Sequence, residues 1–289
     1  MKQPREVAAE RDSMGTIVGL TGVFEGLASM RIAQTKNQVL ESQKFFDELW
    51  QIYTRIRVDD LFRFGRNKEK VAIDKILFII ITAEGGFSGD IDQRLIREML
   101  KEYSPETHEI IVIGHHGAIQ LSQRGVSYEK YYKLPVRDQN INVRPLIQHI
   151  SEHKSTVVFY QSYESLMVQN IKRIELQNAV SDAGQRNAKS EQADDDDDTI
   201  SDATYIFEPS TYEVVAHLER SMLQISLSQL ILGSKLAQYA SRFRSMSAAK
   251  QRGEETFHSL SVQYNRTKRA VSDERLKEII NGLRGKQAV

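Results

Sequence analysis

Residues 218–246 read LERSMLQISLSQLILGSKLAQYASRFRSM, and this stretch decides the fold. Its hydrophobic residues recur at steps of three, four or seven, which is the spacing of a seam along an α-helix that pairs with another helix. The predicted seam consists of Leu218, Met222, Ile225, Leu232, Leu236, Tyr239, Phe243 and Met246. The same spacing continues through Phe257, Leu260, Tyr264 and Val271. A helix of roughly 70 residues would reach about 105 Å, which no compact core requires. The pattern therefore predicts a shaft.

A second helical segment is predicted near the start of the chain, because apolar residues recur at helical spacing between residues 39 and 61. Upstream, Gly15, Gly19, Gly22 and Gly26 lie three or four residues apart. Each glycine inside a helix costs about 1 kcal/mol relative to alanine, so the sequence favours a frayed segment here. The alternative is a smooth groove that lets another helix approach closely. Residues 65–67 are expected to end the segment.

The middle of the chain has a different sequence pattern. Short β-branched runs alternate with short amphipathic segments, which is typical of a mostly parallel α/β sheet. The predicted strands are residues 75–82, 109–114, 155–160 and 171–176, and the predicted helices are residues 91–103, 118–124 and 143–150. Residues 178–203 lose this periodicity and carry five consecutive aspartates at 194–198, so we expect a disordered acidic loop.

The predicted fold class is α/β plus a long antiparallel α-helical coiled coil, in which the paired N- and C-terminal helices flank an inserted α/β domain. The expected domains are residues 1–68 (N-terminal helix), 69–178 (α/β domain), 179–204 (acidic loop) and 205–289 (C-terminal helix). Ser210 and Glu213 predict a capping box at the start of the long helix, and Gly282 predicts its end. Each long helix would cover the apolar stripe of the other.

Composition excludes some classes of site. The chain has 289 residues and no cysteine, so it can form neither a disulfide nor a thiolate metal site. Its start is charged, so no signal peptide is expected, and the apolar run at 76–81 is too short to span a membrane. The net charge is zero, yet residues from Ser210 onward carry 5 Lys and 8 Arg against 7 acidic residues, a net of +6. This basic charge is either a solvated helix surface or a contact with an acidic partner.

No motif has the spacing that catalysis requires. The glycine-rich turn at residues 85–89 lacks the G-x-G-x-x-G spacing, so a tight βα turn is favoured over a nucleotide site. His115 and His116 are adjacent and have no visible third ligand, so a solvent-facing loop is favoured over a metal site. The basic residues near Arg266 are interleaved with apolar seam positions, which argues against a DNA-binding helix. We therefore expect no catalytic residue, cofactor or metal.

Several stretches together resemble the γ subunit of F-type ATP synthases, in a divergent or alternate bacterial form. Residues 264–270, Tyr-Asn-Arg-Thr-Lys-Arg-Ala, are similar to the family's signature near the end of its C-terminal helix. Residues 205–210 resemble its entry to that helix, residues 81–92 its glycine-rich turn, and residues 113–117 its IGKKG motif. Lys268 and Arg269 replace the usual Arg-Gln pair, and Ser88 replaces a cysteine. These matches occur in the family's order from about residue 71 onward.

The resemblance implies the central rotor shaft of a rotary F1Fo ATP synthase, a non-catalytic subunit on the cytoplasmic face of the bacterial membrane. Its α/β domain is implied to be Rossmann-like without binding a nucleotide. Its implied partners are the α and β subunits of the α3β3 head, the ε subunit and the c-ring, with no nucleic acid. The residues implied to contact the catalytic head are Arg266, Lys268, Arg269, Glu278, Ile279 and Ile280. Two alternatives stay open at this stage: a small-ligand-binding α/β enzyme that its helices oligomerise, and a passive coiled-coil scaffold.

Overall fold

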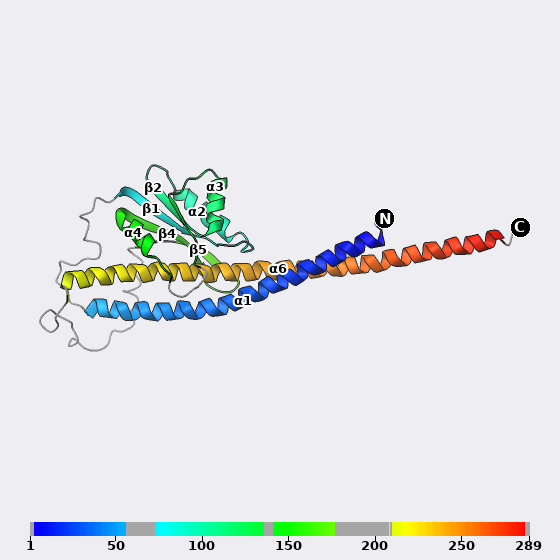
Figure 1. Cartoon of the computed structure of the whole chain (residues 1–289), viewed down its shortest axis with the longest axis horizontal. Helices are drawn as coiled ribbons and strands as arrows, with labels where there is room; N and C mark the ends of the chain where they lie inside the picture. The colour runs from blue at the N-terminus through cyan, green and yellow to red at the C-terminus, as the bar shows by residue number, and fades with distance from the viewer. Residues whose placement is uncertain (1–2, 56–72, 136–140, 177–207, 209, 287–289) are drawn as a thin grey trace. The chain divides into compact units, whose positions relative to one another are not determined.

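The computed structural model describes residues 3–55, 73–135, 141–176, 208 and 210–286 (Figure 1). Its elements, in chain order, are α1 (Pro4–Arg55), β1 (Ile73–Ile81), α2 (Ile91–Glu102), β2 (His108–Ile113), α3 (His115–Gln123), β3 (Lys130–Tyr132), α4 (Arg144–Glu152), β4 (His153–Tyr163), β5 (Gln169–Glu175) and α6 (Thr211–Lys286). The predicted helix end at residues 65–67 and the predicted acidic loop lie outside the described residues.

The five strands form one sheet in the order β3-β2-β1-β4-β5. The pairs β3-β2, β2-β1 and β1-β4 are parallel, and β5 runs antiparallel to β4 as an edge strand. The mostly parallel sheet predicted from the sequence is therefore confirmed. β1 is buried on both faces from Leu77 to Ile81, which explains its uninterrupted run of apolar residues.

Helices cover both faces of this sheet. On one face, Leu95 and Met99 of α2 and Leu121 of α3 pack against Phe78 and Phe159. On the other face, the sheet packs against α4 and against the part of α6 that carries Leu227 and Ile231. The long helix therefore supplies part of the core of the α/β domain.

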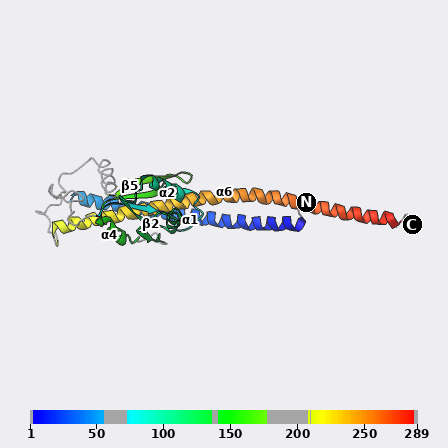
Figure 2. The same cartoon turned by 90° about the horizontal axis from the view of Figure 1, so that it is seen from above.

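The chain divides into two compact units, residues 29–241 and residues 1–28 with 242–289. In the first unit, Phe46 of α1 packs against Met222 of α6, and the Gln229 side-chain amide donates to the Ser42 carbonyl over 3.0 Å. In the second unit, Figures 1 and 2 show the start of α1 running beside the later part of α6. In each unit, residues later in α1 contact residues earlier in α6, so the pairing is antiparallel, as predicted.

The prediction that the glycine-rich segment frays is wrong, because α1 is helical through Gly15, Gly19, Gly22 and Gly26. The seam of α1 repeats every seven residues: Val7 and Ala28 are buried, and Met14, Thr21 and Ser42 are partly buried. Pairing along such a seam offsets the helix-propensity penalty of the glycines.

The start of α6 was predicted better than its end. The Glu213 amide donates to the Ser210 hydroxyl oxygen over 3.3 Å, so Ser210 accepts as the capping box predicts. Gly282 does not stop the helix, which continues to Lys286. Because a glycine ends a helix only when the chain turns away there, its presence alone was a weak stop signal.

One described helix is long and apolar enough to cross a membrane by length and composition, namely Pro4–Ile52 of α1. This segment was not predicted as a candidate, because it contains no long uninterrupted apolar run. The same segment carries the seam that pairs with α6, and length with composition is weak grounds for a membrane span.

Candidate functional site: the junction of α6 with the sheet

The order of the strands creates a switch point between β1 and β4, because the chain places β2 and β3 on one side of β1 and then returns to place β4 on its other side. In open α/β sheets, ligands bind in the crevice at the carboxyl ends of the strands at this point. Here that crevice holds a buried polar network built by α2, β4 and α6. Its central members are Asp92, Gln161, Ser234 and Gln238, each at most 3% exposed.

Hydrogen bonds connect these side chains across the three elements. The Gln161 amide nitrogen donates to Asp92 Oδ1 over 2.8 Å, and Gln161 Oε1 accepts from the Ser234 hydroxyl and from Gln238 Nε2. Gln238 Nε2 also donates to Ser234 Oγ over 3.2 Å. The crevice that could admit a ligand is thus filled by polar side chains of the long helix.

Two further contacts attach α6 to loops of the α/β domain. The Ser241 hydroxyl donates to the Ser88 carbonyl oxygen over 2.6 Å, in the glycine-rich turn that follows β1. The Lys235 ammonium donates to the Pro135 carbonyl oxygen over 2.7 Å, and the Lys235 side chain is almost fully buried. Buried polar groups that are fully paired fix one arrangement of the elements that carry them. The junction therefore fixes how α6 is seated on the sheet.

His116 is part of this network and not of a solvent-facing loop, which corrects the sequence analysis. It lies in the first turn of α3, and its Nδ1 donates to Asp92 Oδ2 over 2.7 Å. The hydrogen bond to Asp92 raises the pKa of His116 above its ordinary value of 6.5, against the opposing effect of burial. His115, the adjacent residue, is exposed and donates its backbone amide to Glu84.

Two of the stretches that resemble the ATP synthase family, residues 81–92 and residues 113–117, pack against each other at this edge of the sheet. Gly114 has a φ of +98°, and a Cβ there would lie 2.1 Å from the Thr82 carbonyl oxygen. The Thr82 hydroxyl donates to the Ile113 carbonyl over 3.0 Å and accepts from the Gly117 amide over 3.0 Å. Glycine is required at residue 114 for this close approach.

In the other unit, the paired helices approach closely at Gly253 of α6, where a Cβ would lie 2.8 Å from Val18 Cγ2 of α1. Lys250 forms an ion pair with Glu25 at 3.2 Å, and the Arg11 guanidinium lies 4.9 Å from the centroid of the Tyr264 ring. This arrangement combines close backbone contact with charged contacts at the edge of the seam.

The predicted seam residues differ in burial. Met222, Leu232, Leu236 and Met246 are buried, and Leu218, Ile225, Tyr239 and Phe243 are partly buried. A second buried face of α6, which packs on the sheet or joins the junction, was not predicted: Leu227, Ile231, Ser234, Lys235, Gln238 and Ser241. The signal was present, since small and apolar residues fill the positions between those of the seam.

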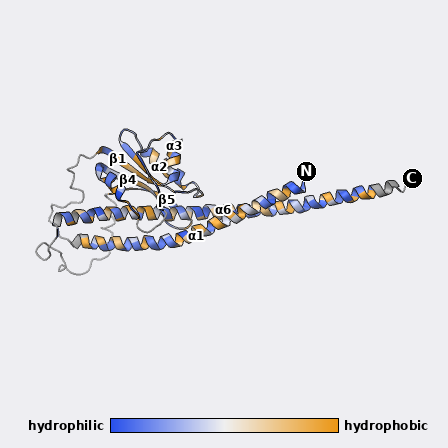
Figure 3. Cartoon of the chain, viewed as in Figure 1, coloured by the Kyte–Doolittle hydropathy of each residue, from blue (hydrophilic) through white to orange (hydrophobic). Residues whose placement is uncertain are grey.

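The residues predicted to contact a catalytic head lie on the last part of α6. Arg266, Lys268, Arg269, Glu278, Ile279 and Ile280 are all exposed. The side chains of Leu276, Ile279 and Ile280 are 57%, 61% and 45% exposed, and Figure 3 shows hydrophobic residues recurring into this part of the helix. The described chain thus leaves an apolar surface here that its own residues do not cover.

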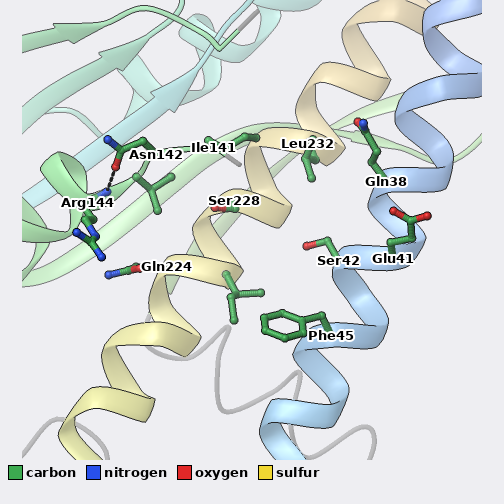
Figure 4. Close-up of a pocket in the computed structure, with 12 residues that line it drawn as sticks. Gln38, Glu41, Ser42, Phe45, Ile141, Asn142, Arg144, Gln224, Ser228 and Leu232 are labelled. Atoms are coloured by element: carbon green, nitrogen blue, oxygen red, sulfur yellow. Dashed lines mark hydrogen bonds between the residues drawn. The ribbon is translucent and has the colours of Figure 1, made fainter. Parts of the chain in front are cut away.

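An open groove lies between α1, α6 and the residues that lead into α4 (Figure 4). Glu41 and Arg144 are the charged residues among those that line it, and the Arg144 amide donates to the Asn142 side chain over 3.2 Å. The lining includes Ser42 and Ser228 but no histidine. Among the described residues, this groove therefore lacks a hydroxyl nucleophile paired with a histidine base.

Comparison with known proteins shows one consistent likeness. A family model described as ATP synthase matches residues 3–285. The ATP synthase gamma chain of Desulfitobacterium hafniense is 20% identical over 292 residues, with 98% of each chain covered. The ATP synthase gamma chain of Enterococcus hirae is 26% identical over 224 residues, which cover 73% of this chain and 70% of that one.

Solved structures share the fold. A chain of the Euglena gracilis mitochondrial ATP synthase, in an assembly of OSCP, F1 and c-ring, matches with a TM-score of 0.66 at 15% identity and covers 98% of this chain and 95% of that chain. A chain of the rotor of the same enzyme matches with a TM-score of 0.59 at 14% identity and covers 92% and 98%. Because the family model takes in both long helices and the domain between them, the chain belongs to the ATP synthase family, and the relatives named here are its gamma chains.

Proposed function

We propose that this chain is the γ subunit of a rotary F1Fo ATP synthase, the shaft that couples rotation of the c-ring to the catalytic cycle of the α3β3 head. The observation that carries the proposal is that one part of α6 is buried and another part has exposed apolar side chains. Between Met222 and Ser241 the helix is seated in the α/β domain, whereas Leu276, Ile279 and Ile280 are exposed. A shaft needs both properties, because it must be held firmly at one end and turn inside a bearing at the other.

The mechanism is mechanical. An asymmetric axle inside a ring of three α and three β subunits presents a different face to each catalytic subunit, so the subunits adopt different nucleotide affinities. Rotation by a third of a turn exchanges these states, and the position of the axle and nucleotide binding are reciprocally coupled. The polar junction centred on Gln161 would transmit torque between the α/β domain and α6.

The chain itself performs no chemistry in this proposal. The ε subunit and the c-ring would bind the α/β end, and the head would surround the later part of α6. Arg266, Lys268 and Arg269 would form exposed charged contacts that change with each step, each contributing about 1 kcal/mol or less. The complex would be peripheral to the cytoplasmic face of the bacterial cell membrane.

Co-purification with the head tests the proposal. The chain, expressed with the α and β subunits of its own enzyme, should purify with them in a ratio of one to three to three. Ile279→Asp with Ile280→Asp should weaken that complex, because it places two charges in an apolar bearing. A head that purifies without this chain bound to it, or that binds the double variant as tightly as the wild type, would contradict the proposal.

A second test concerns stiffness. Leu236→Ala and Phe243→Ala remove seam contacts, and a buried truncation such as Leu236→Ala typically costs about 2–5 kcal/mol. Hydrolysis of ATP by the assembled head should survive while ion pumping falls, since the axle then twists without transmitting torque. Full coupling in both variants would show that stiffness of the helix pair does not matter.

A further inference from the structure

A cluster of three possible metal ligands lies at the amino ends of the strands, at the edge of the sheet opposite the polar junction. Glu109 is the second residue of β2, Glu129 directly precedes β3, and His153 begins β4. One ligand atom from each lies within 4.8 Å of the other two. The proposed rotor function gives these residues no role.

The hydrogen bonds of His153 determine which ring nitrogen is free to coordinate. Its side chain is 1% exposed, and its Nδ1 lies 2.7 Å from the His149 carbonyl oxygen. A carbonyl oxygen only accepts, so Nδ1 must carry a proton, and in the neutral ring Nε2 then presents a lone pair. Metal-binding histidines typically donate their second ring N–H to a backbone carbonyl in this way.

The partner of Nε2 is a carboxylate. Glu109 Oε2 lies 3.1 Å from His153 Nε2, while Glu109 Oε1 lies 3.1 Å from the Lys75 ammonium. A lone pair and a carboxylate oxygen at this distance repel each other unless a proton or a cation lies between them. Ligand bonds of about 2.0–2.1 Å in a tetrahedral site place neighbouring ligand atoms about 3.3 Å apart, close to the separation found here.

The position of Glu129 favours the cation. Its carboxylate approaches the same pair of atoms from the position before β3, and its side chain is exposed. Its backbone is held by the 2.8 Å hydrogen bond from the Glu129 amide to the Ile110 carbonyl oxygen. A proton on His153 requires only Glu109, whereas the convergence of a second carboxylate completes three ligands and leaves a fourth position open to water.

We propose that Glu109, Glu129 and His153 bind a divalent transition-metal ion. One imidazole and two carboxylates suit zinc and its neighbours in the first row, and they suit magnesium or calcium poorly because those ions prefer oxygen ligands alone. The ion would cross-link the amino ends of β2, β3 and β4. Local sequence patterns miss this site because its ligands lie 20 or more residues apart along the chain.

Calorimetric titration with Zn²⁺ tests the site on the purified full-length chain after treatment with a chelator. At about pH 8, where most imidazoles are neutral, the wild type should bind one equivalent and unfold at a higher temperature when zinc is present. Glu129→Gln and His153→Gln should each weaken that binding at least about 10-fold, since loss of even an outer-shell partner costs that much. Glu106→Gln, an exposed carboxylate in the turn before β2, is the matched control and should bind as the wild type does.

Two results would overturn the proposal. Absence of saturable zinc binding by the wild type would mean that His153 and Glu109 form only a proton-mediated pair. Binding that is unchanged in Glu129→Gln would place the ion elsewhere, for instance on the aspartates at residues 194–198. Because Glu129 is exposed, its variant should stay folded and decides the question even if His153→Gln does not fold. Neither result bears on the rotor function, which co-purification tests separately.

Discussion

The two parts of α6 carry the same kind of apolar periodicity but meet different surroundings. Between Met222 and Ser241 the helix is buried on one face by α1 and on another by the sheet, and Ser234, Lys235, Gln238 and Ser241 form hydrogen bonds with the α/β domain or with each other. Around Leu276 and Ile280 the apolar side chains are exposed. The difference shows that a periodic apolar stripe indicates only that a helix packs against a partner. Whether that partner is the same chain or another molecule can be seen only in the structure.

The largest expected effect separates these two parts directly. Leu227→Ala should lower the free energy of unfolding by about 2–5 kcal/mol, because it leaves a cavity in the core that α6 shares with the sheet. Leu276→Ala removes the same atoms from an exposed position and should change it by at most about 0.5 kcal/mol. Chemical denaturation of the purified chain measures both. Equal effects would break the comparison.

The polar junction should matter next. Gln161→Leu removes the acceptor for Ser234 and the donor to Asp92, and each buried polar group that loses its partner costs about 1–3 kcal/mol. Gln148→Leu, at an exposed position on α4, is the control and should leave stability nearly unchanged. Denaturation curves of the two variants would sharpen the comparison, and a stable Gln161→Leu protein would show that the network is dispensable.

Alanine substitutions at two glycines should have opposite signs. At Gly253 a Cβ meets Val18, a stiff β-branched residue, and overpacking of about 1–3 kcal/mol exceeds the helix-propensity gain of about 1 kcal/mol. At Gly26 a Cβ meets nothing within 4 Å, so Gly26→Ala should stabilise the helix by about 1 kcal/mol. Thermal melting followed by circular dichroism distinguishes them. Stabilisation by both would mean that the helices do not approach closely at Gly253.

The smallest effect concerns pH. The pKa of His116 is raised in the folded state by its hydrogen bond to Asp92, so protonation of His116 stabilises the fold. This contribution is complete below about pH 6.5 and is lost as the pH rises through the higher folded pKa. The stability advantage of the wild type over His116→Gln should therefore shrink between pH 6 and pH 9. NMR titration should place the pKa above 6.5, and a lower value would contradict the assignment.

Much of the fold could be predicted from local pattern. The β-branched runs at residues 75–82 and 109–114 correspond closely to β1 and β2, since buried parallel strands need such runs. Strand β3 was missed because Lys130, Tyr131 and Tyr132 are too few and too polar to show a period. The continuity of α1 was also missed, because pairing with α6 overrides the local cost of its glycines.

The sites were predicted less completely, for a physical reason. The seam positions follow from spacing within one helix, so residues such as Met222 and Leu236 could be named in advance, and both are buried. The hydrogen bonds from Gln161 to Asp92 and from Ser234 to Gln161 each join residues about 70 positions apart. No local period records such contacts, because only the folded sheet brings these side chains together.

Rotation of this chain inside the assembled head tests the account most directly. The chain has no native cysteine, so Ser127→Cys, at an exposed position before β3, gives a single attachment point for a visible probe. With the α3β3 head fixed to a surface and ATP supplied, we expect the probe to turn in one direction in steps of a third of a turn. A probe that stays still while the head hydrolyses ATP would contradict the account.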